Sequence, residues 1–440
     1  MSRSLVADIV VTCIDGAAQV HSPGQIDIDD QGRVMHAGPC RQTDCSVIDN
    51  VGGLLMPGLV NTHGHAPMVL LRGLGDGLPL ERWLTEAIWP TEARLGPGDV
   101  EWGMRLAVAE MLLAGVTTTC DMYFDDAAMI QAVLATGGRH LCTPGVVGAV
   151  HMRTPNGLAD RMAEIRTLHS EFHDPNGRIT VGIGPHSPYD LPIDVVVELA
   201  QMAIDLETVL HLHVAETMTE GAALESAHGC STVQVLEQAG ILNGHVLSAH
   251  SVWIDDNDIA AFAQRGTHVA HCPTSNMKLG SGIAPVRELL AAGVNVALGT
   301  DGAASNDDLD LWDEMALAPL LARVKAHDPG ALTATQALLM ATANGGRALG
   351  LNVGTLATGS WADIVRVDLD RPSWQPLSDP NTDIDQLVSR LVFSTKSRDV
   401  TDVWVAGERV VSDRVLTTID LDEAMTEVQS RGRRLAGRSG

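Results

Sequence analysis

The stretch Pro57–His65, which reads PGLVNTHGH, opens the part of the chain that decides the fold. Its apolar residues form a run of strand length, and the run ends in His63 and His65. Residues two apart on a strand point to the same side, so these two imidazoles share one face. Such a pair gives a divalent metal two ligands, although an isolated HxH pair is also found as a hydrogen-bonded polar pair without metal.

Seven more apolar runs of strand length follow this one and alternate with helical patterns as far as Gly350. Two of the predicted helices, Val100–Ala114 and Pro285–Ala292, each end at a glycine, which is a helix stop signal. Eight strand–helix units over about 290 residues match the size of a (β/α)₈ TIM barrel. A doubly wound open sheet is the alternative α/β fold. The eight predicted strands are Leu59–His63, Val116–Asp121, Leu141–Val147, Ile179–His186, Thr208–Glu216, His245–His250, His268–Cys272 and Val294–Asp301.

Both ends of the chain show short β-type runs separated by turn signals, and Ala406-Gly407 is typical of a hairpin turn. We therefore expect residues 1–57 and 359–440 to form one small β-sandwich domain, with a terminal helix, beside a barrel of residues 58–358. The runs are Leu5–Cys13, Gln25–Ile28 and Arg33–Met35 near the start, and Ala362–Val367, Asp402–Val405 and Glu408–Val411 near the end.

The composition of the 440 residues argues against several classes of function. The chain has 29 Lys and Arg against 55 Asp and Glu, a net charge of −26, which argues against nucleic acid or an anionic membrane as partner. No apolar run is long enough to span a bilayer, and the first residues are typical of a strand rather than a signal peptide. The seven cysteines are scattered without a CxxC pair, so we expect a reducing, cytoplasmic location.

Histidines and one aspartate lie where the predicted strands end. In a TIM barrel the active site is built at the carboxyl ends of the strands. There His63, His65, His213 and Asp301 would supply three nitrogen ligands and one oxygen ligand and leave a position for water, as a catalytic metal requires. Imidazole and carboxylate suit Zn²⁺ and also Fe²⁺, so the ligand types do not decide the metal. Zn²⁺ is the expected ion, with Fe²⁺ as the alternative.

Lysine is rare in this chain. Barrel hydrolases with two metals often bridge them through a carbamylated lysine on a middle strand. The three lysines are Lys278, Lys325 and Lys396, and none lies between His65 and His213. We therefore expect one metal ion.

Four further residues at or near the strand ends have two interpretations each. Glu216, three residues after His213, is either a helix N-terminal glutamate or a proton shuttle between a metal-bound water and the leaving group. His250 either assists catalysis or packs in the core. His211 lies one pleat deeper than His213, in the core or behind the ligands, and His271 is structural or a ligand.

With these residues identified, the chain resembles the amidohydrolase superfamily over nearly its full length. It is most similar to the branch with 5′-methylthioadenosine/S-adenosylhomocysteine deaminases and s-triazine hydrolases. The motifs are MPGLVNTHGH (Met56–His65), WLTEAIWPTEA (Trp83–Ala93), GVTTTCDMY (Gly115–Tyr123), GPHSPY (Gly184–Tyr189), HLHVAET (His211–Thr217), SAHS (Ser248–Ser251), HCPTSNMKLGSG (His271–Gly282) and GTDGAASNDDLDLWDEM (Gly299–Met315).

The resemblance implies roles for individual positions and a β-sandwich split between the termini. It assigns Glu216 as the acid/base carboxylate and His250 as the imidazole that assists the attacking water. Glu92 would hold ribose hydroxyls, and His186 would hydrogen-bond the nucleoside. Its metal ligands are the four residues derived above, and the substrate-binding set also includes Glu216 and Asp301.

One departure from the family pattern bears on the substrate. Members that accept S-adenosylhomocysteine place an arginine where this chain has Pro144. Another arginine of the family could correspond to Arg161 or Arg153, in a loop whose alignment is loose. We therefore expect a hydrolytic deaminase of 5′-methylthioadenosine or adenosine, with S-adenosylhomocysteine disfavoured. The alternatives are a triazine aminohydrolase or chlorohydrolase and a metal-dependent binding protein without activity. The expected partner is a small nucleoside or nitrogen heterocycle, with homo-oligomerisation left open.

Overall fold

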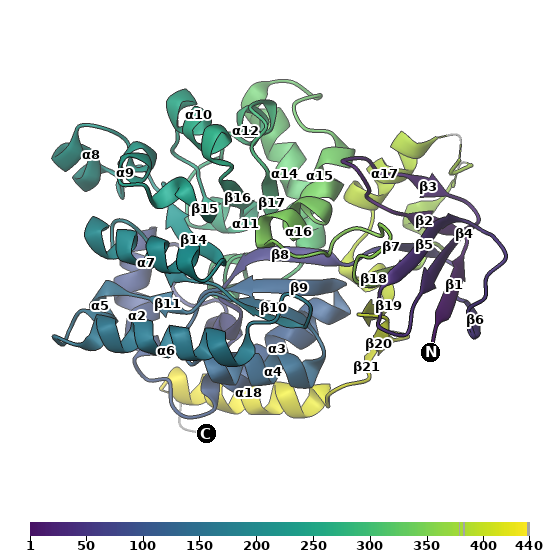
Figure 1. The fold of residues 1–440 in the computed structure, drawn as a ribbon, viewed down its shortest axis with the longest axis horizontal. Coiled ribbons are helices and arrows are strands. Elements are labelled where there is room, and N and C mark those ends of the chain that lie inside the picture. Colours follow the sequence, from purple (N-terminus) through teal and green to yellow (C-terminus); the bar gives the residue numbers. More distant parts are fainter. Residues whose placement is uncertain (378, 382, 438–440) are drawn as a thin grey trace.

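The computed structural model describes residues 1–377, 379–381 and 383–437. Its central part contains two parallel four-stranded sheets, ordered β12-β10-β9-β8 and β14-β15-β16-β17, and a parallel pair β11-β13. The protein is therefore an α/β protein (Figure 1). The strands are β8 (Leu59–Gly64), β9 (Val116–Asp121), β10 (Arg139–Cys142), β11 (Gly145–Val146), β12 (Ile179–Val181), β13 (Gly184–Pro185), β14 (Val209–Val214), β15 (His245–His250), β16 (His268–His271) and β17 (Val296–Leu298).

Hydrogen bonds join the two four-stranded sheets at both edges. On one side Ile183 N donates to Val209 O at 2.8 Å, and His211 N donates to Ile183 O at 2.9 Å. On the other side Asp301 N donates to His63 O at 3.0 Å. The carboxyl ends of these strands consequently meet at one end of the molecule, near α2 and α8 at the left of Figure 1.

Six of the eight predicted strands each overlap one strand of the structure, but β17 covers only Val296–Leu298 of the predicted Val294–Asp301. The predictions over Val116–Asp121 and His245–His250 are confirmed as β9 and β15. Leu141–Val147 and Ile179–His186 were wrong as single strands, because each divides into two. Pro144 lacks the N–H that would continue a ladder after β10. At Gly182 a Cβ would lie 2.8 Å from Val209 O, a close approach that only glycine allows.

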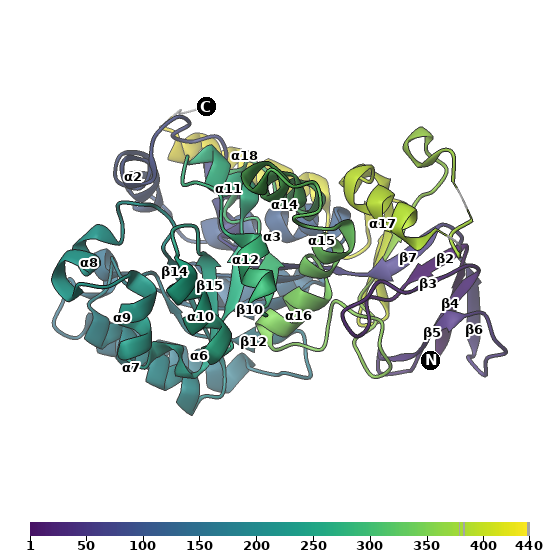
Figure 2. The ribbon, with the colours of Figure 1, turned by 90° about the horizontal axis from the view of Figure 1, so that it is seen from above.

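Helices connect the central strands and cover them (Figures 1 and 2). The two predicted helices are confirmed within one residue at each end as α3 (Asp99–Leu113) and α12 (Val286–Ala291). The longer of the other helices are α4 (Asp126–Thr136), α6 (Gly157–Phe172), α7 (Ile193–Asp205), α10 (Asp256–Arg265), α14 (Leu311–Ala326), α17 (Ile384–Phe393) and α18 (Leu421–Leu435). The shorter ones are η1 (Ala66–Leu71), α1 (Leu80–Arg82), η2 (Trp83–Ile88), α2 (Trp89–Glu92), α5 (Gly148–His151), α8 (Ala222–His228), α9 (Thr232–Gln238), η3 (Ile241–Asn243), α11 (Pro273–Lys278), α13 (Ala303–Asn306), α15 (Ala334–Met340), α16 (Ala343–Leu349), η4 (Pro372–Trp374) and η5 (Ser397–Asp399).

Strands from both ends of the chain share one seven-stranded sheet, ordered β21-β20-β19-β18-β7-β2-β3. A second sheet, β5-β4-β1-β6, contains only N-terminal strands. Figure 2 shows this group of strands beside the central part. The strands are β1 (Arg3–Ala7), β2 (Ile9–Val11), β3 (Val20–His21), β4 (Gly24–Ile28), β5 (Val34–Pro39), β6 (Val47–Asn50), β7 (Leu54–Pro57), β18 (Ile364–Val367), β19 (Val400–Val405), β20 (Glu408–Ser412) and β21 (Val415–Leu416).

One prediction in this region was wrong. Leu5–Cys13 is not one strand, because the chain passes from one sheet to the other at Asp8, whose carboxylate accepts a hydrogen bond from Gly53 N at 2.7 Å. The predicted hairpin turn at Ala406-Gly407 is confirmed: it joins β19 to β20 with positive φ at both residues. No helix in the described part of the chain combines the length and hydropathy needed to cross a bilayer.

Candidate active site

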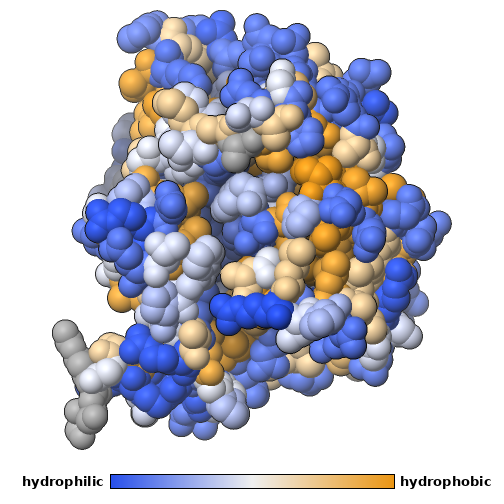
Figure 3. Space-filling view, turned by 90° about the vertical axis from the view of Figure 1, so that its left-hand side faces the viewer, coloured by the Kyte–Doolittle hydropathy of each residue, from blue (hydrophilic) through white to orange (hydrophobic). Residues whose placement is uncertain are grey.

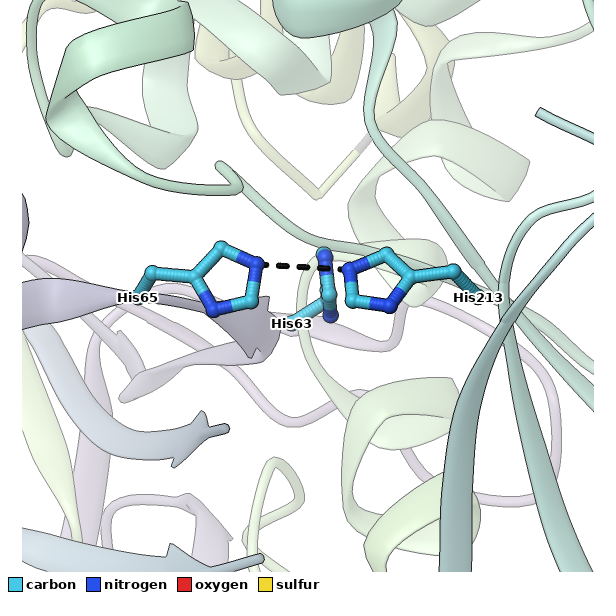
Figure 4. Close-up of side chains that lie close together, drawn as sticks. All are labelled: His63, His65 and His213. Carbon is cyan, nitrogen blue, oxygen red and sulfur yellow. Dashed lines mark hydrogen bonds between the residues drawn. The ribbon is translucent and has the colours of Figure 1, made fainter. Parts of the chain in front are cut away.

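Four predicted ligands come together at the carboxyl ends of β8, β14 and β17. His63 lies in β8, His65 follows it, His213 lies in β14, and Asp301 stands three residues after β17. The ligand atoms of His63, His65 and His213 lie within 4.8 Å of one another, and the same limit holds for those of His63, His250 and Asp301. Figure 4 shows the rings of His65 and His213 facing each other with His63 between them.

The ligand atoms of this group lie close to one another. Nε2 of His65 lies 3.3 Å from Nε2 of His213 and 3.3 Å from Oδ1 of Asp301. Nε2 of His63 lies 3.5 Å from the same carboxylate oxygen and has no hydrogen-bond partner, although its side chain is fully buried. The ligand atoms thus form two overlapping groups of three that share His63, and His65 lies close to the carboxylate of the second group.

The tautomers of two of these histidines follow from their other ring nitrogen. Nδ1 of His65 donates to the carbonyl oxygen of Met122 at 2.6 Å, and Nδ1 of His213 donates to that of His186 at 2.7 Å. A carbonyl only accepts, so in the neutral rings the lone pairs are on Nε2. Two facing lone pairs at 3.3 Å repel each other, and a cation bound by both removes the repulsion. The donor set thus fits a divalent metal.

Burial and charge keep the group in the ionisation state that metal binding requires. Burial lowers the pKa of His63 to about 4 and that of His213 well below its usual value, so both imidazoles are neutral at pH 7. Burial alone would raise the pKa of Asp301. Contact with His63 and the nearby imidazoles outweighs this effect and holds that pKa well below its usual range, so the carboxylate is charged.

Hydrogen bonds orient the Asp301 carboxylate. Ser275 and Ser305 donate to Oδ2 at 2.6 and 2.9 Å, and Gly302 N donates to Oδ1 at 2.8 Å. The backbone of Asp301 is in the left-handed region, with φ of 64°, an unfavourable conformation that often marks functional residues. Both serines lie on short helices, α11 and α13, so these helices fix the direction of the carboxylate.

Glu216 and His250 form a second pair beside this group. Oε2 of Glu216 lies 3.8 Å from Nε2 of His250, and Ser281 donates to Oε1 at 3.3 Å. Nδ1 of His250 donates to Oδ1 of Asn276 at 2.9 Å, which turns Nε2 toward Glu216. Burial raises the pKa of Glu216. Burial lowers the pKa of His250, but the carboxylates of Glu216 and Asp301 raise it more, and the net shift is upward.

A cavity of about 690 Å³, including its open mouth, joins these groups to the predicted substrate residues Glu92 and His186. Tyr123 donates to Oε1 of Glu92 at 2.7 Å, and burial raises the pKa of this glutamate. Figure 3 shows hydrophobic side chains gathered on this end of the molecule. The apolar lining includes Leu80, Trp83, Leu84, Ile88, Trp89, Phe124 and Leu279.

The structure shows where the residues lie for which the sequence left more than one interpretation open. Glu216 lies outside the helices and is buried in the cavity wall, so it is not a helix N-terminal residue. His271 is buried outside this cavity, whereas His211 contacts His63. Arg161 is held by Asp126 at 2.7 Å, so it is engaged within the protein.

Several polar residues around the ligands were not identified from the sequence. Tyr123, Thr143, Ser275, Asn276 and Ser305 contact site residues in the structure. Most of them lie within the family motifs quoted above. Their location in a motif is the signal by which the sequence could have identified them as site residues. Their individual contacts depend on spatial neighbours far along the chain.

The chain is similar to known proteins over nearly its whole length. The chain matches the amidohydrolase family over residues 54–410 and belongs to this family. One relative, the 5-methylthioadenosine/S-adenosylhomocysteine deaminase of Pelotomaculum thermopropionicum, is 39% identical over 100% of both chains.

Two solved structures are also similar to this chain. An adenosine deaminase from Xanthomonas campestris with bound zinc has a TM-score of 0.92 and 33% identity, over 99% of this chain and 98% of that one. The atrazine chlorohydrolase of Arthrobacter aurescens, complexed with zinc, has a TM-score of 0.87 and 25% identity, over 98% and 100%.

Proposed function

We propose that this protein is a hydrolytic deaminase of adenine nucleosides that releases ammonia. The preferred substrates are 5′-methylthioadenosine or adenosine, and S-adenosylhomocysteine is disfavoured. The observation that carries the proposal is the buried Glu216, which lies beside the four-residue ligand group without belonging to it. A metal-dependent binding protein has no use for such a proton donor. The names of the deaminase relatives support the same reaction.

The proposed metal site consists of His63, His65, His213 and Asp301, and Zn²⁺ is the proposed ion. Both zinc-containing neighbours support this choice. When bound, a divalent metal of this kind lowers the pKa of its water toward neutrality and so supplies a nucleophile. The protein would hold the ion with the imidazoles of His63 and His213, which burial keeps neutral, with the imidazole of His65 and with the charged carboxylate of Asp301.

In the proposed mechanism, protein groups move the protons. The water oxygen bonds to the ring carbon that carries the amino group, and Asp301 and His250 accept the proton that the water loses. Protonated Glu216 gives its proton to the adjacent ring nitrogen, a step favoured by the raised pKa of this buried carboxyl. The carbon–nitrogen bond to the amino group then breaks. Ammonia leaves with the proton taken from the water, and the remaining hydroxyl proton returns to Glu216 as the ring carbonyl forms.

The cavity residues outside the ligand group are proposed to select the substrate. Glu92 is proposed to hold the ribose hydroxyls and His186 to hydrogen-bond the nucleoside. Among the described residues that line this cavity there is no arginine or lysine to pair with an amino-acid carboxylate, and Arg153 lines a neighbouring cavity. The apolar walls suit a methylthio or unsubstituted 5′ group better than a charged homocysteinyl group.

A second candidate is a triazine hydrolase, which the similarity to the atrazine chlorohydrolase favours. The deciding experiment measures ammonia and chloride release by the zinc-loaded protein. The panel consists of adenosine, 5′-methylthioadenosine, S-adenosylhomocysteine, an aminotriazine and a chlorotriazine. We expect kcat/KM to be highest for the two uncharged nucleosides. A higher value for a triazine would favour the second candidate, and no release from any compound would contradict both.

We also infer that the central strands close into a (β/α)₈ barrel over residues 58–358. The hydrogen bond from Asp301 N to His63 O and that from Thr62 Oγ1 to Leu298 O, at 2.8 Å, support closure between β17 and β8. Residues 1–57 and 359–440 are proposed to form the sandwich. Buried Leu5, Ile26 and Trp404 from its two sheets belong to one hydrophobic cluster. The cytoplasmic location and homo-oligomerisation stay predictions.

A further inference from the structure

A line of buried hydrogen bonds runs behind His63, on the side away from Asp301. Nδ1 of His63 lies 2.8 Å from Nε2 of His211, and Nδ1 of His211 lies 2.9 Å from Oγ1 of Thr143. The hydroxyl of Thr143 lies 2.9 Å from the carbonyl oxygen of Asp121. The side chains of His63, His211 and Thr143 are all fully buried, so water does not compete for these bonds.

The direction of each bond follows from the last acceptor in the line. A carbonyl oxygen only accepts, so the single hydroxyl hydrogen of Thr143 goes to Asp121 O. Oγ1 of Thr143 then accepts from Nδ1–H of His211, and a neutral His211 has its lone pair on Nε2. That lone pair accepts from Nδ1–H of His63, which leaves the lone pair of His63 on Nε2.

If these hydrogen bonds had the opposite direction, His63 could not bind a metal through Nε2. If Thr143 donated to His211, both rings would change tautomer together, and Nε2 of His63 would carry the hydrogen. A protonated ring nitrogen has no lone pair for a metal. It would also leave Asp121 O without this hydrogen bond. The carbonyl therefore selects one of two arrangements of the whole line.

We propose that Thr143 and His211 are positioning residues that fix the tautomer of His63, so that Nε2 presents its lone pair to the divalent metal. This inference rests on the proposed role of His63 as a ligand. His65 and His213 are oriented by backbone carbonyls, which substitutions do not remove. The orientation of His63 depends on side chains and can be tested by changing them.

Metal affinity gives the first test. In Thr143→Val a methyl group replaces the hydroxyl, and Nδ1 of His211 retains only Sγ of Cys120, a weak acceptor at 3.6 Å. We expect the Zn²⁺ affinity of the full chain, measured by competition with a chromophoric chelator, to fall by about 10- to 100-fold. Thr143→Ser keeps the oxygen and should stay within about 3-fold of wild type.

A matched control separates the hydrogen bond from the general loss of a buried hydroxyl. Oγ1 of Thr118, in β9, is buried without a hydrogen-bond partner, so Thr118→Val should leave Zn²⁺ affinity unchanged. Wild-type affinity in Thr143→Val would overturn the proposal. So would an equal loss in both valine variants, or no recovery in the serine variant.

A second experiment determines the tautomer of His63 directly in the wild-type protein. In the metal-free wild-type chain, ¹⁵N chemical shifts distinguish N–H from bare nitrogen in each histidine ring, with His63 identified by its loss in His63→Asn. We expect hydrogen on Nδ1 and none on Nε2. Hydrogen on Nε2 would overturn the proposed direction even if His63 is a ligand. The predicted tautomer together with undiminished zinc binding in His63→Asn would refute the ligand role alone.

Discussion

The hydroxyl of Tyr123, just after β9, donates a 2.7 Å hydrogen bond to Oε1 of Glu92 at the end of α2. This contact fixes the carboxylate in the wall of the cavity that His65 and His213 also line. Among the described residues, no side chain other than Tyr123 donates to this carboxylate. The second oxygen of Glu92 is therefore available to a hydroxyl-bearing ligand.

Changing Glu92 should distinguish a ribosylated substrate from a ribose-free one. A hydrogen bond to a charged group contributes about 1.5–3 kcal/mol, so Glu92→Gln should raise KM for adenosine about 10-fold or more. KM for an aminotriazine should stay within about 2-fold, since it has no ribose. The exposed Glu86, paired with Arg82, supplies the control Glu86→Gln. Equal KM increases for both compounds would contradict the ribose contact.

Glu216→Gln should separate metal binding from proton transfer. The variant should retain one zinc per chain because Glu216 is outside the ligand group. Its kcat should fall by about 10²- to 10⁴-fold, the usual contribution of a general acid. Glu225→Gln, at an exposed position in α8, is the control. Turnover near the wild-type value, measured by ammonia release, would remove Glu216 from the mechanism.

Loss of a ligand should abolish metal retention. We expect His213→Ala and Asp301→Ala to lose zinc during dialysis, as measured by mass spectrometry, while circular dichroism verifies that each variant is folded. His228→Ala, at an exposed position in α8, should keep a full zinc content. Wild-type zinc in either ligand variant would show that the convergent side chains do not hold the ion.

Buried Glu314 should make stability depend on pH. Burial raises its pKa from 4.5 to about 8, while it accepts hydrogen bonds from Thr274 N at 3.0 Å and Asn306 Nδ2 at 2.7 Å. The folded state therefore binds a proton that the unfolded state has lost. The stability that this proton contributes is present below pH 4.5 and is lost as the pH rises to about 8.

Glu314→Gln removes this titration. Between pH 5 and 8, the free energy of unfolding of the wild type should fall relative to that of the variant by at most about 1.4 kcal/mol per pH unit. Urea unfolding at several pH values measures the difference, and other titrating groups cancel because both proteins share them. Parallel pH profiles for the two proteins would contradict the raised pKa.

The buried pair Arg139–Asp363 should contribute to the attachment of β18 to the central sheet. Nε of Arg139 lies 2.9 Å from Oδ2, and both side chains are at most 2% exposed. Arg139→Met leaves a buried charge unpaired, and should reduce the free energy of unfolding by about 3–5 kcal/mol. The exposed pair Arg82–Glu86 supplies the control Arg82→Met, with a loss below about 1 kcal/mol.

The double variant Arg139→Met/Asp363→Asn tests whether the loss of stability arises from the unpaired carboxylate of Asp363. It removes both charges and should recover part of the lost stability. Urea unfolding of zinc-saturated protein measures all of these variants. If the double variant is less stable than Arg139→Met, the loss does not arise from an unpaired carboxylate.

The sequence predicted the elements whose signals are local. Runs such as Val116–Asp121 contain enough apolar residues to mark a buried strand, and Gly115 and Gly293 mark helix ends through their positive φ of 86° and 83°. The division at Gly182 was not predicted, because it depends on the approach of Val209 from another strand. Composition alone does not reveal such a neighbour.

The site residues also divide into those that a local pattern predicts and those that depend on distant parts of the chain. His63 and His65 are visible as a pair because the strand period places them on one face. Glu92 became visible only through family resemblance, since it lies on a helix rather than at a strand end. The contact between His211 and Thr143 depends on which strands are neighbours and on their register, so no local pattern predicts it.

The pairing of β7 with β18 has a consequence for biosynthesis. On the ribosome, β7 emerges early, whereas its partner β18 emerges only after all the strands that carry the proposed metal ligands have been made. During that interval the edge of β7 lacks its hydrogen-bonding neighbour, and an unpaired edge invites association with other chains. The order of translation thus exposes the newborn protein to aggregation at this strand until its last part is complete.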